Sequence, residues 1–315
     1  MKLICNPATY AGKALKRWPS IFKALKEAGL DFEVEWTKSP YEAIKIAKES
    51  VKEHDILVSY GGDGTITEVL TGIAQTGFKA TLGVIPVGRG NDDAFNLRQT
   101  TKIDDVIEML IEKKTRLVDC IEVDDGVKYC IGVAGTGLDG VVAERTYRKS
   151  NKIVYTLALI RAILSYRPRH MRIDIDDGKI VRDQKCLLVI AGNGRRVGAN
   201  KMVTPNAIID DGLLDVMICG DTGVIDTLIT SAKLGKGTHI YHPKVEVLRG
   251  KKVYIENKSD KRIPSHAMGE LLGPLPHKFV CIHKKLKVLR MSDAVLERAG
   301  WTHSDVFLEN VKKGK

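Results

Sequence analysis

A glycine-rich turn joins a predicted strand to a predicted helix in the sequence Ile56-Leu57-Val58-Ser59-Tyr60-Gly61-Gly62-Asp63-Gly64-Thr65. The apolar run before Gly61 predicts a buried strand, and the spacing of residues 66–74 predicts a helix. Glycines let a ligand approach the backbone, and the amino end of a helix offers free N–H groups and a positive dipole to a phosphate. Asp63 suits that anionic setting if a divalent cation bridges its carboxylate to phosphate oxygens. A plain tight turn, with Asp63 as the helix cap, is the alternative.

A second glycine turn follows the next predicted strand, in the sequence Pro86-Val87-Gly88-Arg89-Gly90-Asn91-Asp92. Both turns follow the carboxyl ends of strands, where open α/β sheets bind their ligands. The side chains of Asn91 and Asp92 are suited to bind a ribose or a cation. The sequence contains neither the P-loop pattern nor the three-glycine Rossmann pattern, so a nucleotide site here would be of another kind.

The pattern of the chain changes near residue 120. Before it, predicted strands at 2–5, 32–36, 55–59 and 81–85 alternate with predicted helices at 13–28, 66–74 and 103–111. This alternation predicts a parallel sheet covered by helices. After residue 120, short strands joined by Gly- and Asp-rich turns dominate, with helices only at 140–165 and 222–235, which predicts a β-sandwich-rich domain. Residues 292–311 predict a short amphipathic helix with a basic tail.

The composition excludes several classes of protein. Apolar residues make up 43% and charged residues 28%, which excludes a disordered chain, a collagen-like fibre and a coiled-coil rod. The net charge of +11 favours an anionic partner, which would be a nucleic acid, a phosphorylated metabolite or a membrane surface. Six widely spaced cysteines without CxxC spacing predict small buried side chains in a reducing cytosol, not disulfides or a zinc site.

A basic and partly apolar stretch spans residues 145–172. It contains no acidic residue, and its cations are Arg145, Arg148, Lys149, Lys152, Arg161, Arg167, Arg169 and Arg172. A helix with apolar surface and flanking cations can lie on an anionic membrane. The alternative is an ordinary core stripe formed by Ile153, Leu157, Ile160 and Leu164 beside a solvated basic rim. Because aromatic residues make up only 6% of the chain, we expect no nucleic-acid partner.

These motifs resemble the diacylglycerol kinase catalytic family, in particular the small bacterial soluble lipid kinases, which are related to NAD kinases and sphingosine kinases. The resemblance covers nearly the whole chain and is carried, in order, by Asn6-Pro7, Gly61–Thr65, Pro86–Asp92, Ala134–Asp139, Ala191–Gly194, Pro205–Ala207 and Asp211–Asp215. It implies an α/β nucleotide-binding domain at residues 1–120 and a β-rich substrate or lipid domain at 121–288, with the active site in the cleft. A C-terminal helix and basic tail at 289–315 would pack on the first domain.

The resemblance also implies two cofactors, ATP and Mg²⁺. Matched by position, the nucleotide contacts are Asn6, Thr37, Gly61, Gly62, Asp63, Gly64, Thr65, Ile66, Thr67, Arg89, Asn91 and Asp92. A cation site of bacterial members falls on the turn before Leu214, with the carboxylate of Asp211 and the backbone carbonyls of Ile208 and Leu213 as ligands. Without the resemblance, Asp211-Gly212 alone would indicate a hairpin turn.

Three positions depart from the family pattern. The family's catalytic Asp-Gly-Glu is matched here by Met268-Gly269-Glu270, and a thioether cannot take a proton, so Glu270 and Asp63 remain as catalytic candidates. Arg89 stands where the family usually has a small residue, commonly Thr. It would pair with a phosphate, crowd the nucleotide or stay solvated at the loop tip. The loop at residues 6–13 is longer than usual.

The first functional hypothesis is an ATP-dependent lipid kinase that transfers the γ-phosphate to a diacylglycerol-like acceptor. One alternative is a family member that binds nucleotide or lipid but is catalytically impaired by Met268. Another is a kinase of the same fold that acts on a non-lipid hydroxyl. We expect a cytoplasmic protein that reaches the inner face of the membrane through residues 145–172 if their membrane interpretation holds. The sequence leaves open the identity of the acceptor and whether the chain forms a homodimer.

Overall fold

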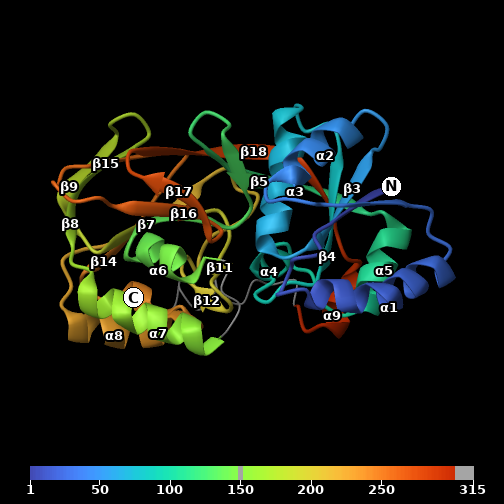
Figure 1. Cartoon of the computed structure of the whole chain (residues 1–315). Coiled ribbons are helices and arrows are strands. Elements are labelled where there is room, and N and C mark those ends of the chain that lie inside the picture. The colour runs from blue at the N-terminus through green and yellow to red at the C-terminus, as the bar shows by residue number, and fades with distance from the viewer. Residues whose placement is uncertain (148–151, 302–315) are drawn as a thin grey trace. The chain divides into compact units, whose positions relative to one another are not determined.

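The computed structural model describes residues 1–147 and 152–301 (Figure 1). The chain divides into two compact units. The first unit contains Met1–Val118 together with the chain from Lys284 on, and the second contains Asp119–His283. The chain passes from one unit to the other within β5 (Thr115–Val123) and again within β18 (His277–Leu289).

A parallel sheet lies at the centre of the first unit. Its strands are β1 (Lys2–Cys5), β2 (Glu33–Trp36), β3 (Ile56–Gly61) and β4 (Thr81–Pro86). They stand in the order β2-β1-β3-β4, and the end of β18 pairs with β4. All neighbouring pairs are parallel, as the alternation of strands and helices predicts. The carboxyl ends of β1 to β4 therefore lie at one edge of the sheet.

Helices cover both faces of this sheet (Figure 1). They are α1 (Lys13–Glu27), α2 (Glu42–Ser50), α3 (Asp63–Gln75), α4 (Asp92–Asn96), α5 (Ile103–Glu112) and α9 (Asp293–Arg298). Buried residues of α1, α5 and α9 share one core with alternate residues of the strands, including Val58 and Tyr60. The helices α2 and α3 lie on the other face and pack closely, since a Cβ on Gly72 would come 2.5 Å from the Cβ of Ala47.

The end of the described chain returns to the first unit. Arg298 of α9 pairs with Asp105 at 2.7 Å and with Glu108 at 3.1 Å, both on α5. The two acceptors are separated by one helical turn, so one guanidinium holds both. The predicted helix and basic tail span residues 292–311; α9 covers Asp293–Arg298, and the residues from 302 on lie outside the described part of the chain.

The second unit contains two antiparallel sheets. One holds β15 (Lys252–Asn257), β8 (Arg169–Ile175) and β9 (Ile180–Cys186) beside the first part of β18, with β5 and β6 (Lys128–Cys130) paired to it. The other holds β14 (Val245–Gly250), β13 (Leu214–Cys219), β10 (Leu188–Gly192), β7 (Val133–Gly137), β16 (Pro264–Ala267) and β17 (Glu270–Pro274), in that order. A short ribbon pairs β11 (Arg196–Val197) with β12 (Lys201–Met202).

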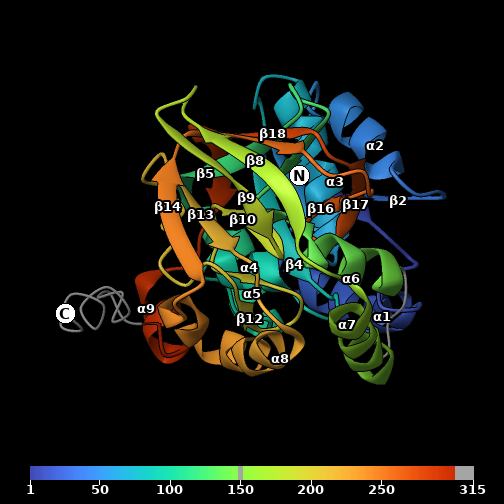
Figure 2. The same cartoon turned by 90° about the vertical axis from the view of Figure 1, so that its left-hand side faces the viewer.

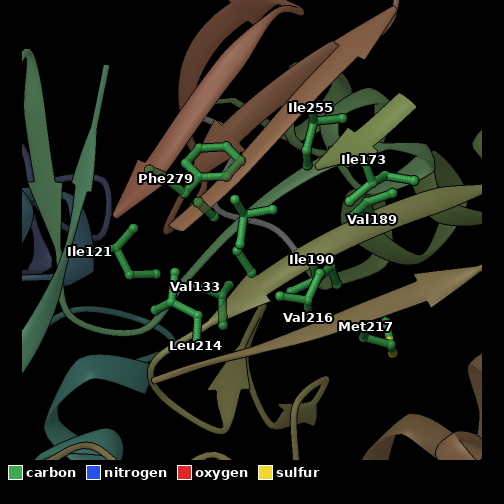
Figure 3. Close-up of a cluster of buried hydrophobic side chains, with 14 of the residues drawn as sticks. Ile121, Val133, Ile173, Val189, Ile190, Leu214, Val216, Met217, Ile255 and Phe279 are labelled. Carbon is green, nitrogen blue, oxygen red and sulfur yellow. The ribbon is translucent and has the colours of Figure 1, made fainter. Parts of the chain in front are cut away.

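Apolar side chains from both sheets meet in one core (Figure 3). Phe279 and Ile255 come from the first sheet, and Val216 and Ile190 come from the second. All four are buried, so the two sheets form a sandwich whose filling is this cluster. The predicted fold class, an α/β unit followed by a β-sandwich-rich unit, is confirmed.

Three helices of the second unit lie outside the sandwich (Figure 2). They are α6 (Leu138–Thr146), α7 (Lys152–Ser165) and α8 (Val224–Lys233), and the 3-10 turns η1 (Leu234–Lys236) and η2 (Thr238–Tyr241) follow α8. A separate apolar cluster joins α6, α7 and the start of α8. No helix within residues 1–147 and 152–301 is long and apolar enough to cross a bilayer.

All six cysteines are free and buried, as their spacing predicts. Burial raises the pKa of the Cys186 and Cys281 thiols to about 12. A thiol with so high a pKa carries almost no thiolate at neutral pH, so these side chains pack as small apolar groups.

Candidate functional site

The two glycine turns leave the same edge of the parallel sheet. In the register of β3 and β4, Gly61 lies opposite Pro86, so the turns begin side by side. A Cβ on Gly88 would lie 2.5 Å from the Cα of Gly62, and one on Gly62 would lie 3.2 Å from the Cα of Gly88. The two backbones therefore touch: a side chain at Gly88 would force one turn to move, and one at Gly62 would make a tight contact.

Asp63 connects the two turns. It is the first residue of α3, and its Oδ1 accepts a hydrogen bond from the backbone N–H of Asp93 at 2.9 Å. Asp93 belongs to α4, which follows the second turn. The half-buried carboxylate thus lies at the amino end of α3, where the helix dipole favours negative charge. Its oxygens are the kind of ligand that Mg²⁺ prefers.

Asn6 joins this edge from β1. Its Nδ2 donates to Oγ1 of Thr65 at 3.1 Å, and its Oδ1 accepts from the N–H of Ala8 at 3.0 Å. A Cβ on Gly61 would collide with the Thr65 side chain at 2.5 Å, so glycine is required for this packing. Thr37 follows β2 directly and is almost fully buried, and its N–H donates to the carbonyl of Cys5 at 2.9 Å.

Two of the predicted contacts point inward. Ile66 and Thr67 are buried within α3, so a ligand at the turn has no access to their side chains. Sequence spacing alone did not separate the open first residues of the helix from these two.

The second turn presents polar groups beside the first. Asn91 adopts the left-handed conformation at φ 51°, and its buried Oδ1 has no hydrogen-bond partner among the described residues. Asp92 is buried at the start of α4. Arg89 is half-exposed, and it forms no hydrogen bond or ion pair with any residue that the structure describes. Its guanidinium is therefore available to a ligand.

In the second unit, Met268 occupies a tight hairpin turn between β16 and β17. Ala267 pairs with Glu270, and Met268 and Gly269 have φ values of 47° and 82°. A two-residue turn with positive φ at both positions favours Asn-Gly or Asp-Gly, so methionine is conformationally unfavourable there. The side chain is 6% exposed and belongs to the sandwich core. Its Sδ accepts a hydrogen bond from the N–H of Val133 at 3.2 Å.

Glu270 lies next to this turn and is half-buried. Its Oε2 is 3.5 Å from the hydroxyl of Tyr147, which is long for a hydrogen bond. Among the side chains described at this hairpin, it is the one with a carboxylate.

A histidine that sequence reasoning did not single out supports the turn. His266 is buried, and its Nδ1 accepts from the N–H of Gly269 at 3.1 Å. The neutral ring then carries its proton on Nε2, which donates to Oδ2 of Asp139 at 2.6 Å. Asp139 belongs to a motif quoted for the family resemblance, but nothing in the sequence pairs it with a residue so distant along the chain.

At the turn predicted to bind a metal cation, the carboxylate of Asp211 is already paired with an arginine side chain of the same unit. Oδ1 of Asp211 accepts from the N–H of Leu213 at 3.0 Å, and Oδ2 pairs with the guanidinium of Arg249. The same guanidinium donates through Nε to the buried Asp215 at 2.9 Å. Burial raises the pKa of the Asp215 carboxyl, although the charge of Arg249 acts in the opposite direction.

These contacts oppose a metal ion at the turn. A cation would have to displace Arg249 from the carboxylate of Asp211 before it could join that carboxylate to the carbonyls of Ile208 and Leu213. The side chains as they lie do not fit the cation that the resemblance implies here.

Two family models match the chain along almost all of its length. The diacylglycerol kinase catalytic domain matches residues 1–123, and the YegS C-terminal NAD kinase beta sandwich-like domain matches residues 132–290. The chain belongs to the diacylglycerol kinase catalytic-domain family. The two matches correspond to the α/β unit and to the sandwich, so both parts of this family are present.

Curated relatives of this kinase family span nearly the whole chain. The diacylglycerol kinase of Staphylococcus saprophyticus is 27% identical over 298 residues, which cover 93% of this chain and 95% of the relative. The diacylglycerol kinase of Staphylococcus aureus strain Newman is 28% identical over 302 residues, or 94% of each chain.

Solved structures share the fold. A diacylglycerol kinase structure from Bacillus anthracis has a TM-score of 0.69 at 21% identity, and the match covers 93% of this chain and 97% of that one. Another structure from the same organism has a TM-score of 0.76 at 24% identity with the same coverage. These structures show the fold, and the two family models confirm the recognition of the family from the sequence.

Proposed function

We propose that this protein is an ATP-dependent lipid kinase that transfers the γ-phosphate to the hydroxyl of a diacylglycerol-like lipid. Membership of a kinase family supports the reaction class, and the names of the relatives support the acceptor. The observation that carries the proposal is the contact between the backbones of Gly62 and Gly88 at the amino end of α3. Two turns without side chains at that position leave backbone N–H groups open to a phosphate chain.

The nucleotide would bind along the edge formed by the first unit. Its proposed contacts are Asn6, Thr37, the backbone from Gly61 to Thr67, Arg89, Asn91 and Asp92. Arg89 has no hydrogen-bond or ion-pair partner among the described residues. It would pair with phosphate oxygens, because a guanidinium donates two parallel hydrogen bonds to such a group. Asp63 would hold a Mg²⁺ ion, which supplies charge neutralisation on the phosphates when it is bound.

Glu270 is the proposed proton acceptor for the lipid hydroxyl. Met268 occupies the position at which the family usually has aspartate, and its buried thioether cannot act as a base. A positioned base contributes about 10²–10⁴ in rate, while phosphoryl transfer depends mostly on positioning and charge stabilisation. We therefore expect a slow kinase. His266 would hold the turn that carries Glu270.

The burial of Met268 also favours a second candidate function. A side chain that packs in the core and accepts the Val133 N–H leaves no catalytic group at position 268. The protein would then bind nucleotide or lipid without turnover.

Transfer of labelled phosphate from Mg-ATP into a total lipid extract tests the proposal. The wild-type protein, Met268→Asp and Glu270→Gln are compared with Glu256→Gln, which alters a carboxylate elsewhere in the second unit that pairs with Lys258. We expect slow labelling by the wild type, faster labelling by Met268→Asp and at least a tenfold loss in Glu270→Gln, since removal of a base costs about 10²–10⁴. Glu256→Gln should match the wild type.

Other outcomes separate the alternatives. Label that enters lipid only with Met268→Asp would favour the impaired binder. Label that enters a water-soluble acceptor without lipid would favour a non-lipid hydroxyl. If Mg-ATP at about 100 times its Kd failed to add the roughly 2.7 kcal/mol of stability that binding requires, the nucleotide proposal itself would be wrong.

A further inference from the structure

Two neighbouring helices of the second unit expose large apolar side chains. Each is exposed over 40% or more of its surface, and they are Leu157, Ile160 and Leu164 on α7 and Ile225, Leu228 and Ile229 on α8. We call these six residues the apolar face. The core-stripe alternative for residues 157, 160 and 164 is therefore wrong, while the side chain of Ile153 lies outside the described residues.

The sides of α7 and α8 that are turned away from the apolar face are buried. Ala162 and Ile163 of α7 share a buried cluster with Val142 of α6, and Val224 of α8 packs against it. Contacts join α7 to α8 directly, and Figure 2 shows both helices outside the sheets. The spacing of the exposed residues, three or four apart on each helix, places each row on one side of its helix. The cluster thus accounts for the buried sides and leaves the apolar face in water.

Cations border the apolar face. Arg161 on α7, Lys233 at the end of α8 and Lys236 in η1 are exposed, and none forms an ion pair with a described residue. The sequence contains no Asp or Glu at 145–173, so α7 lies in an acid-free stretch. On α8 the one acidic residue is Asp226 in the first turn, and no Asp or Glu follows it up to residue 245. Arg148 and Lys149 of the predicted basic stretch lie outside the described residues. The exposed Tyr241 in η2 adds an aromatic ring of the kind that favours membrane interfaces.

We infer that α7 and α8 together form the surface by which this protein docks on an anionic membrane. The inference rests on the proposed function, because a lipid acceptor has to be taken from a membrane. Apolar side chains would enter the boundary between headgroups and acyl chains, and the cations would pair with lipid phosphates. A second copy of the chain fits less well, because it would bring the same unpaired cations against each other.

Vesicle co-sedimentation of the full-length protein tests the inference. Vesicles of phosphatidylcholine are compared with vesicles that also contain phosphatidylglycerol, at low and high salt. We expect binding only to the anionic vesicles and weaker binding at high salt. Ile160→Gln with Leu164→Gln should weaken binding at least about tenfold, and so should Ile225→Gln with Ile229→Gln. A tenfold change corresponds to about 1.4 kcal/mol, and the loss of two buried apolar side chains is expected to reach that amount. Lys233→Gln with Lys236→Gln should reduce the preference for anionic vesicles.

A matched control removes apolar surface elsewhere. Leu117→Gln with Val127→Gln alters two exposed side chains that belong to neither helix and should bind as the wild type does. Circular dichroism melting of each variant checks that it is folded. The inference would be overturned if the variant Ile225→Gln with Ile229→Gln bound anionic vesicles as strongly as the wild type does. It would also be overturned if the wild-type protein did not bind these vesicles. If the wild-type protein formed a concentration-dependent dimer and the α7 or α8 double variant did not, the partner of the apolar face would be a second copy of the chain and not a membrane.

Phosphate transfer to a short-chain, water-soluble diacylglycerol separates this inference from the proposed function. If the α7 and α8 pairs keep wild-type transfer to that acceptor but lose transfer to vesicle lipid, both conclusions stand. Transfer to the soluble acceptor without vesicle binding would overturn only the docking surface. Vesicle binding without any transfer would overturn only the kinase.

Discussion

The two glycine turns of the first unit contact each other through their backbones, whereas the Asp211 turn and the Met268-Gly269 turn of the second unit form contacts through side chains. In the first unit, Gly62 and Gly88 touch through their backbones, and no side chain lies between them. In the second unit, each turn engages an internal side chain. Arg249 pairs with Asp211, and the thioether of Met268 accepts the Val133 N–H.

This difference shows how two parts of one family fold can diverge independently. A phosphate site made of backbone groups depends on glycine here, because a Cβ on Gly88 would collide with the opposite turn. A catalytic or cation site made of side chains depends on single residues, and one substitution changes its chemistry while the hairpin remains.

The largest expected effect comes from Gly88→Ala. The new Cβ would meet the backbone of Gly62 at 2.5 Å, so one of the two turns has to move. We expect a loss of about 1–3 kcal/mol in the free energy of unfolding, as overpacking typically causes, and loss of protection by Mg-ATP. Thermal unfolding with and without Mg-ATP measures both quantities.

Gly235→Ala is the matched control, since a Cβ there would meet nothing within 4 Å. It should keep the wild-type response to Mg-ATP. Full Mg-ATP protection in Gly88→Ala would show that the contact between the turns is not required for nucleotide binding, which would remove the main difference between the two units.

An intermediate effect is expected from Arg89→Ala. If the guanidinium pairs with a phosphate, its loss should weaken ATP binding about tenfold, because a hydrogen bond to a charged group is worth about 1.5–3 kcal/mol and water replaces part of it. Titration calorimetry measures the Kd. Arg17→Ala removes an exposed cation elsewhere in the first unit and controls for net charge. Tighter binding by Arg89→Ala would indicate crowding, and unchanged binding would indicate a solvated side chain.

The smallest expected effect concerns Mg²⁺ at the Asp211 turn. Without nucleotide, the wild-type unfolding temperature should be the same in EDTA and in Mg²⁺, because Arg249 engages the carboxylate. Arg249→Met should be less stable, since it leaves the buried Asp215 without its guanidinium partner. Mg²⁺ at about ten times its Kd should then restore about 1.4 kcal/mol.

Arg182→Met provides the control for this comparison. Arg182 donates two hydrogen bonds to Glu246, at 3.0 and 2.6 Å, and neither residue is a predicted cation ligand. Its loss should destabilise the second unit without any rescue by Mg²⁺. Stabilisation of the wild type by Mg²⁺ would mean that the ion displaces Arg249 from Asp211. The Asp211 turn would then be open to a ligand, as the glycine turns of the first unit are.

Sequence reasoning predicted the glycine turns well because their determinants are local. A run of apolar residues, three glycines and a helical pattern define the β3–α3 turn within about 20 residues, and parallel pairing then brings the β4 turn beside it. It did not predict that the side chains of Ile66 and Thr67 are buried, since a motif does not say which residues of a helix face the core. It missed His266 because Asp139, its partner, is 127 residues away along the chain.

By itself, the sequence determined the fold class, the family and the places of the two glycine turns, because each depends on residue types at short spacing. Only the tertiary structure decided that Arg249 reaches Asp211 from 38 residues away and that Met268 reaches Val133 across 135 residues. It likewise decided that residues 157, 160 and 164 face water and not the core. Such contacts depend on which distant elements pack together, and burial then determines whether a polar, charged or apolar group has a partner.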